Sequence, residues 1–389
     1  MVAMSEASNS RQTVAVCALV LFLTGFGGSV LFVALPGIAS EFHADVDTLA
    51  NLGSILSLGS AIAVPLAVLA DRRRRGPIAA VGIAGFSVSA IAAALAPSLG
   101  ALGVARVVAV CFETLVASVA TAAALEAVSG GRRGRTASLL ALAAGAGGGL
   151  TVIGYPLVAP HWRQLYALAG LGILAAPLAL LIADSALVTQ SRRSARVLLT
   201  SPWRGRIALL GLSGALGALL YEPANFFAVF FGSHTLGLSP FTLSAVLVVS
   251  GVAAAAGYVA GGYISDRFGR RLPSVAILLL GAVVTAITFS RSASVYLAGN
   301  ILWAGLLSAS GPMMGAWTVE LVPSRARVTA FTVTGVIGSL GGLAGLQLVR
   351  GLSPGFGLSG TLWLTAGAAI VGTLALLWLP ETRGSALPD

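Results

Sequence analysis

Apolar segments separated by short polar ones make up almost the whole chain. An α-helix needs about 20 consecutive apolar residues to cross the hydrocarbon layer of a membrane. Twelve segments of roughly that length follow one another: 13–38, 48–70, 77–96, 101–127, 136–158, 164–183, 207–232, 240–264, 272–290, 294–321, 328–350 and 358–379. The pattern therefore predicts an all-α integral membrane protein with twelve transmembrane helices.

Composition supports this interpretation. Charged residues make up 9% of the chain and hydrophobic ones 57%, with a mean hydropathy of +0.95. A soluble domain carries about 25% charged residues, so most of this chain is expected to lie in lipid. The net charge of +10 does not predict nucleic-acid binding, because the arginines occupy short loops between apolar segments rather than a separate basic domain.

The arginines also predict how the chain is oriented. When the loops are assigned alternately to the two sides, nineteen of the 23 arginines fall on one side and only Arg163, Arg291 and Arg350 on the other. Basic loops face the cytoplasm, so both termini are expected there. Every basic residue is arginine, which we interpret as GC-rich codon usage and a bacterial source. The expected location is the bacterial cytoplasmic (inner) membrane.

Charged positions repeat along the chain at a nearly constant offset. The matched pairs are Asp71 and Asp266, Glu126 and Glu320, and Arg133 and Arg327, with offsets of 195, 194 and 194 residues. The chain has only 13 acidic residues, so this agreement indicates an internal repeat. We predict an N-terminal six-helix bundle (1–183), a cytoplasmic linker (184–206) and a C-terminal six-helix bundle (207–389), arranged as the parallel repeats of secondary transporters.

Two loops carry a recognisable motif. Residues 262–271 read Gly-Tyr-Ile-Ser-Asp-Arg-Phe-Gly-Arg-Arg, which resembles the GxxxD-R-x-G-R-R signature of the major facilitator superfamily. A degraded copy lies at 67–75, where Ala67 replaces the first glycine and Arg74 the second. The resemblance covers essentially the whole chain. It implies two pseudo-symmetric six-helix bundles, secondary transport by alternating access, no cofactor, and no enzyme activity.

The resemblance also implies two conformational latches, because acids at these positions of the family pair with loop arginines when the cytoplasmic side is closed. The first latch would contain Asp71, Arg72, Glu126 and Arg133, and the second Asp266, Arg267, Arg270, Glu320 and Arg327. An aspartate at the C-terminal end of a helix is unfavourable unless a cation compensates it. The alternative is that these charges serve only to orient the chain.

Three ionisable residues are predicted inside the membrane. Arg106 corresponds to an arginine found in many proton-coupled members of the family, although Ala109 and Val110 replace the glutamine and glycine that usually follow it. Glu113 lies seven residues on, on the same helix face and about 10 Å further along the axis. Glu222 lies in the middle of the seventh segment. Such groups are costly in lipid and mark transport pathways.

The simpler alternatives are that Arg106 extends towards the outer surface and that Glu113 is protonated and packed. Our hypothesis is that Glu113 or Glu222 carries a proton, because burial disfavours the charged form of a carboxyl group. Tyr221 and Asn225, beside Glu222, are included in the predicted pathway. Trp303 and Trp317 are included as an aromatic wall, with packing or lipid contact as the alternative.

Other features narrow the function. All three histidines, His43, His161 and His234, fall in predicted outer loops, which argues against a membrane metalloprotease. The glycines at 145 and 147–149 fit neither dinucleotide-binding nor P-loop spacing, and we interpret them as helix-packing residues. No cofactor, metal or nucleic-acid partner is predicted. The expected partners are a small molecule, protons and membrane lipid, and the expected state is a monomer.

Two weaker resemblances concern transport direction. Segment 145–163, with its glycines and the Trp162-Arg163 pair, resembles a degenerate antiporter signature of drug-exporting members. Residues 380–384, Pro-Glu-Thr-Arg-Gly, resemble the PETKG ending of sugar porters. We predict proton-coupled export of a small amphipathic compound or drug. The alternatives are proton-coupled uptake of a sugar or small organic acid and, more distantly, a receptor or scaffold that does not transport.

Overall fold

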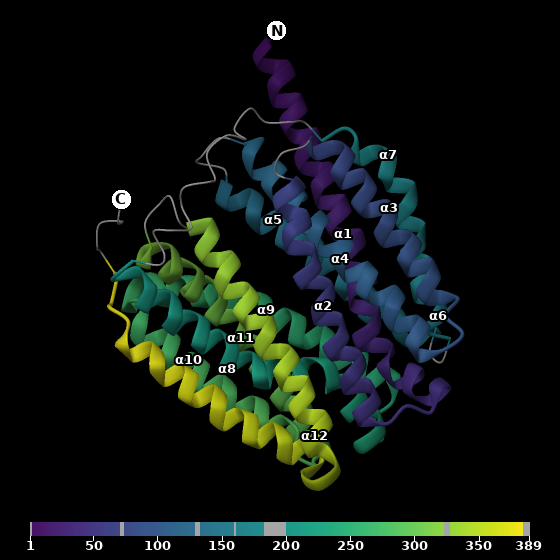
Figure 1. The fold of residues 1–389 in the computed structure, drawn as a ribbon, viewed down its shortest axis with the longest axis vertical. Helices are drawn as coiled ribbons and strands as arrows, with labels where there is room; N and C mark the ends of the chain where they lie inside the picture. Colours follow the sequence, from purple (N-terminus) through teal and green to yellow (C-terminus); the bar gives the residue numbers. More distant parts are fainter. Residues whose placement is uncertain are drawn as a thin grey trace. The chain divides into compact units, whose positions relative to one another are not determined.

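The computed structural model describes residues 2–70, 74–128, 133–158, 161–182, 200–322 and 327–383, and these ranges contain helices and no strand (Figure 1). The α-helices are α1 Val2–Phe42, α2 Val46–Ala70, α3 Arg75–Ala94, α4 Leu99–Glu126, α5 Arg133–Val158, α6 Arg163–Gly170, α7 Ala176–Ala179, α8 Trp203–Phe230, α9 Pro240–Phe268, α10 Arg271–Thr288, α11 Ala293–Leu321 and α12 Arg327–Ala375. Shorter 3₁₀ or π-helical segments are η2 Leu171–Ala175, η5 Phe231–Thr235 and η7 Leu376–Trp378.

Each of the twelve predicted segments corresponds to helical structure. The sixth is not one regular helix, because the 3₁₀ segment η2 separates α6 from α7. The last two are joined into α12, but Gly357 inside it has φ +67° and ψ 171°, so the helical path breaks there. Within the described residues, nine helices are long and apolar enough to cross a membrane. The prediction of an all-α membrane protein is confirmed.

Two of the described helices, α4 and α9, begin at a serine whose side chain caps the helix. Ser98 precedes α4 and its side chain accepts the backbone N–H of Ala101 at 3.2 Å. Ser239 precedes α9, accepts the N–H of Thr242, and is followed by Pro240 in the first turn. Both arrangements satisfy an amide that the helix itself leaves unpaired.

The chain divides into two compact units. The first contains residues 1–43 and 55–189, and the second contains 44–54 and 190–389. This division differs from the predicted bundles mainly at the beginning of α2, which groups with the second unit. Most of the predicted linker, residues 184–199, lies outside the described residues.

Small residues bring helices together within each unit. In the first, a side chain on Gly25 would collide with the backbone of Ala144, and one on Gly147 with the backbone of Phe22, so α1 and α5 are in close contact. In the second, Gly261 on α9 meets the backbone of Ala309 on α11. Such contacts are typical of helices that associate in lipid. The packing interpretation is confirmed for Gly147 and for Gly148, which lies against Ser29, whereas Gly145 and Gly149 face open space.

Candidate functional site

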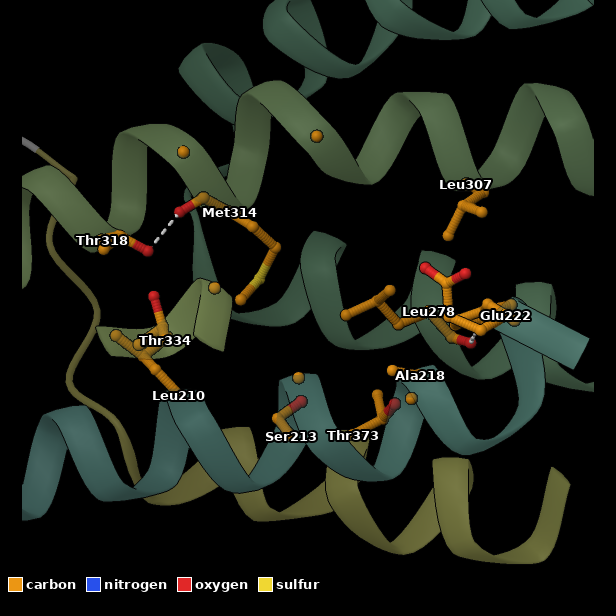
Figure 2. Close-up of a pocket in the computed structure, with 16 residues that line it drawn as sticks. Leu210, Ser213, Ala218, Glu222, Leu278, Leu307, Met314, Thr318, Thr334 and Thr373 are labelled. Carbon is orange, nitrogen blue, oxygen red and sulfur yellow. Dashed lines mark hydrogen bonds between the residues drawn. The ribbon is translucent and has the colours of Figure 1, made fainter. Parts of the chain in front are cut away.

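A cavity of about 510 Å³ lies within the second unit, among helices α8, α10, α11 and α12 (Figure 2). Its walls are mainly apolar, with Leu210 on α8, Leu278 on α10, and Leu307 and Met314 on α11. Five glycines also line it, which leaves backbone rather than side chains facing the space. The volume is in the range of small-molecule sites, about 300–1,000 Å³.

The carboxylate of Glu222 projects into this cavity from α8, between Leu278 and Leu307 in Figure 2. The side chain is exposed to the cavity and has no hydrogen bond or ion pair to any described residue. Its stem rests against Gly342 on α12, where an added Cβ would lie 2.5 Å from Glu222 Cγ. The absence of a side chain at Gly342 therefore makes room for Glu222.

The other polar groups on the cavity wall are hydroxyls, and most donate their hydrogen to backbone. The Tyr221 hydroxyl donates to the carbonyl of Leu278 at 3.3 Å. The three threonines on the wall donate to carbonyls one turn earlier in their helices: Thr318 to Met314 at 2.7 Å, Thr334 to Ala330 at 2.9 Å and Thr373 to Ala369 at 2.8 Å. These side chains face the cavity as hydrogen-bond acceptors.

A second group of ionisable residues lies in the first unit. Arg106 on α4 has only 2% of its surface exposed. Its Nη1 and Nη2 donate to the carbonyls of Gly27 and Gly28 on α1, each at 3.5 Å, and its guanidinium lies 5.5 Å from the ring centroid of Tyr166 on α6. Arg106 is therefore held inside the unit and does not extend to the outer surface.

Glu113 belongs to the same group. Its carboxylate lies against Gly28, where an added Cβ would collide with both carboxylate oxygens. Gly28 thus lies against the Glu113 carboxylate and accepts a hydrogen bond from Arg106 through its carbonyl. The Nε of Arg106 and the hydroxyl of Tyr166 are buried without a hydrogen-bond partner among the described residues. Arg106 and Glu113 both contact Gly28, and Tyr166, which the sequence pattern did not indicate, lies beside Arg106.

A charged network lies at one end of the second unit, around Arg270 between α9 and α10. Arg270 donates to Glu320 through Nη2 at 3.0 Å and to Asp266 through Nη1 at 2.9 Å. The side chains of Arg270 and Glu320 are 12% and 18% exposed, whereas Asp266 is 78% exposed. The hydrogen bonds to Glu320 raise the pKa of Arg270, against the effect of burial, and Asp266 adds to the rise.

The segment after η7 is docked onto this network. The carboxylate of Glu381 accepts the backbone N–H groups of Arg270 and Arg271, each at 2.9 Å. Thr382 Oγ1 donates to Glu320 at 2.5 Å. Burial opposes the charge on Glu381, but these and neighbouring backbone N–H groups outweigh it and lower its pKa below the usual value. Glu381 thus supplies negative charge at the N-terminus of α10, where a helix favours it.

Two overlapping stretches of the sequence, 17–233 and 223–388, match the family model described as Major Facilitator Superfamily. The chain belongs to the major facilitator superfamily. Membership indicates a multi-pass membrane transporter rather than an enzyme, which agrees with the apolar helices. A comparison with curated proteins gives no match.

Solved structures with the same fold include transporters of different kinds. A D-xylose–proton symporter aligns with a TM-score of 0.77 at 18% identity, covering 97% of this chain and 99% of the other. A bacterial homologue of the human lysosomal transporter Spinster, inward-facing and unoccupied, aligns with a TM-score of 0.73 at 19% identity, covering 95% and 93%. The xylose transporter XylE from E. coli, inward open, aligns at 0.71 and 17% identity, covering 96% and 97%. At these identities the likeness shows the superfamily fold alone.

Several predicted pathway residues of this superfamily member do not lie at the cavity. Trp303 and Trp317 are 7% and 0% exposed and belong to packed core clusters. The indole N–H of Trp317 donates to the carbonyl of Pro380 at 3.0 Å. Asn225 is exposed and is not part of the cavity wall. The structure therefore favours packing over the predicted aromatic wall.

The predicted latches are described only in part. Asp71 and Arg72 lie outside the described residues, and the side chains of Glu126, Arg133 and Arg327 are likewise not described. The first latch therefore stays a prediction. In the second, Asp266, Arg270 and Glu320 form the network above, whereas Arg267 donates to the Tyr263 hydroxyl at 2.8 Å. The sequence analysis did not predict that Glu381 and Thr382 belong to a latch, although both lie in the PETKG-like ending, which could have indicated this.

Proposed function

We propose that the protein is a proton-coupled secondary transporter that works by alternating access and exports a small amphipathic compound in exchange for protons. The observation that carries this proposal concerns Glu222, whose carboxylate lies in a mostly apolar cavity of a membrane transporter. This carboxylate has no hydrogen bond or ion pair to any described residue. An ionisable group at membrane depth is costly and is retained where it serves a pathway. Glu222 can hold either a proton or a substrate, but not both at once.

That competition couples the two fluxes. Substrate leaves the cavity when Glu222 takes up a proton, and the proton leaves when substrate binds again. Exchange of a single positive charge for a proton moves no net charge, whereas exchange of a neutral solute for a proton does. A membrane potential acts on each net charge moved with about 2.3 kcal/mol per 100 mV. The dependence of the transport rate on membrane potential therefore reports the charge of the substrate.

Glu113 is the second candidate for carrying a proton. It shares Gly28 with Arg106, whose fixed charge lies close by in the first unit. A nearby cation favours the charged form of a carboxyl group. Arg106 thus supports release of a proton that Glu113 has bound. Tyr166, packed beneath the guanidinium, keeps Arg106 in place.

We place the Arg270 network at the cytoplasmic end and propose that it acts as a latch. The buried Arg270–Glu320 pair and the docked Glu381 support this role, because breaking them costs charge-assisted hydrogen bonds. Asp266→Asn tests it. Unchanged transport together with an unchanged balance between inward- and outward-facing states would remove the latch from the account.

Proton-coupled uptake of a sugar or small organic acid is the second candidate. The docked segment Pro380–Thr382 favours it, because its sequence resembles the ending of sugar porters and the segment contacts the network. Against it, the cavity wall contains no Asn or Gln among the described residues, and amides are suited to recognising sugar hydroxyls.

Reconstitution in liposomes with a pH-sensitive dye inside tests the proposal. Hydrophobic cations, phenicols, sugars and small acids are added in turn under an imposed proton gradient. Antiport predicts solute-dependent proton movement opposite to the solute flux. Movement of both in the same direction would support uptake, and no response to any of these solutes would contradict proton coupling to this panel.

A further inference from the structure

We propose that the cavity of the second unit selects an amphipathic organic cation that carries N–H groups, with Glu222 as its counter-ion. This inference rests on the proposed function and deepens it by naming a substrate class. Three properties of the cavity wall support it: its charge, the hydrogen-bond donors and acceptors that are still free, and the apolar surface around them.

The charge on the described cavity wall is negative. Among the described residues that line the cavity, Glu222 alone is ionisable at neutral pH, and no Lys, Arg or His faces it. The carboxylate has no described partner, so its charge is not balanced by the protein. An anionic ligand would be repelled. A cation would supply the missing charge, and a charge-assisted hydrogen bond is roughly twice as strong as a neutral one.

The hydrogen-bonding groups that remain free on the described wall are mostly acceptors. The hydroxyls of Tyr221, Thr318 and Thr373 already donate to backbone carbonyls. The backbone amides of the surrounding helices are used within those helices. Ser213 is the one hydroxyl on the described wall with no hydrogen bond to a described residue, so it is a free donor. The cavity therefore offers many acceptors and very few donors.

This imbalance distinguishes between ligand classes. A sugar hydroxyl is both a donor and an acceptor, so most of its lone pairs would be left unpaired on a wall that lacks donors. An ammonium group has donors only and no acceptor to leave unsatisfied. The wall matches the ammonium group at Glu222 and the threonines, and it does not match a polyol.

The rest of the cavity suits an apolar body. Leu278 and Leu307 lie on either side of the Glu222 carboxylate, and Met314 lines another part of the cavity, near Thr318 and Thr334 (Figure 2). Met314 can adapt to different ligand shapes because its side chain is flexible. Gly342 keeps the Glu222 stem close to α12 and so leaves the central space open. A ligand with a charged nitrogen at one end and an aromatic or aliphatic group at the other fits this arrangement.

The test is equilibrium binding to the full-length protein in lipid nanodiscs, followed by naphthalene fluorescence. Three probes of similar shape are compared: 2-(1-naphthyl)ethylammonium, its N,N,N-trimethyl derivative and 2-(1-naphthyl)ethanol. The first probe carries a positive charge and N–H donors, the second carries a positive charge without N–H donors, and the third is neutral with one hydroxyl group. The variants are Glu222→Gln and, as a control for net charge, Glu41→Gln, which removes a carboxylate paired with Arg163 at 2.7 Å in the other unit.

We expect the wild type to bind the ammonium probe about tenfold or more tightly than the alcohol, with the trimethyl derivative between them. Glu222→Gln should abolish this preference and leave alcohol binding within about twofold, and Glu41→Gln should behave as the wild type. Equal binding of ammonium and alcohol to the wild type, or an unchanged preference in Glu222→Gln, would overturn the inference.

The liposome experiment separates this inference from the proposed function. Cation binding that depends on Glu222, without proton movement, supports the inference and contradicts proton-coupled transport. Proton antiport driven by a neutral solute and unaffected by Glu222→Gln contradicts the inference and supports antiport. Correct folding of each variant is checked by its thermal unfolding midpoint and its size-exclusion profile.

Discussion

Adding one methyl group at Gly342 should displace Glu222 without changing its chemistry. In Gly342→Ala the new Cβ would lie 2.5 Å from Glu222 Cγ and 3.2 Å from its Cβ. Two carbon atoms pack favourably at about 3.5–4.0 Å, so the Glu222 side chain must withdraw by about 1 Å. Helix α12 cannot easily move instead, because Gly341 and Gly345 are packed against the backbone of Ala215 and Leu219.

The expected cost follows from that displacement. A shift of about 1 Å in a positioned charged group can reduce function by up to about 100-fold. We therefore expect Gly342→Ala to weaken binding of 2-(1-naphthyl)ethylammonium by about 10- to 100-fold. The matched control is Gly338→Ala on the same helix, where an added Cβ meets nothing within 4 Å. This control should bind within about twofold of the wild type and gain slightly in helix propensity.

A double-mutant cycle shows whether the effect passes through the carboxylate. If Gly342→Ala acts by moving Glu222, adding it to Glu222→Gln should change probe binding very little, because that variant has already lost the charge. Fully additive losses would refute the reasoning, and so would a Gly342→Ala variant that binds like Gly338→Ala.

Two further predictions concern other sites. Gly28→Ala should displace the Glu113 carboxylate and lower proton flux in liposomes about tenfold. The control is Gly149→Ala, where an added Cβ meets nothing within 4 Å and the flux should not fall. Equal flux in both variants would contradict the proton role of Glu113. Because the pKa of Glu381 is lowered in the folded protein, the stability it contributes is present above its unfolded pKa, near pH 4.5, and is lost as pH falls through the folded pKa. The unfolding midpoint of the wild type should therefore fall relative to Glu381→Gln as the pH is lowered below 4.5, and a constant difference there would contradict this.

The helices were predictable because the membrane imposes their length and apolar character. The break in α12 at Gly357 falls at the boundary between the predicted segments 328–350 and 358–379. The irregularity in the sixth segment was harder to predict, because the 3₁₀ segment Leu171–Ala175 is as apolar as the helices beside it. This feature depends on packing between helices, which a local pattern does not reveal.

The same limit explains which site residues were found. Glu113 and Glu222 stood out because carboxylates are rare inside apolar segments. Tyr166 lies beside Arg106 because α6 packs against α3 and α1, and its sequence neighbourhood gives no sign of this. The helical spacing of Trp317 fits a residue of the cavity wall and a residue of the core equally well. The structure places it in the core, where its indole donates a hydrogen bond to Pro380.

The central claim is that acidic residues inside the membrane couple protons to transport. The most direct measurement is solute-driven proton movement in liposomes, comparing the wild type with the Glu113→Gln, Glu222→Gln double variant at equal protein content. The account predicts proton movement opposite to solute flux in the wild type and none in the double variant, with correct folding verified in both. Proton-coupled transport that persists in the double variant would contradict it.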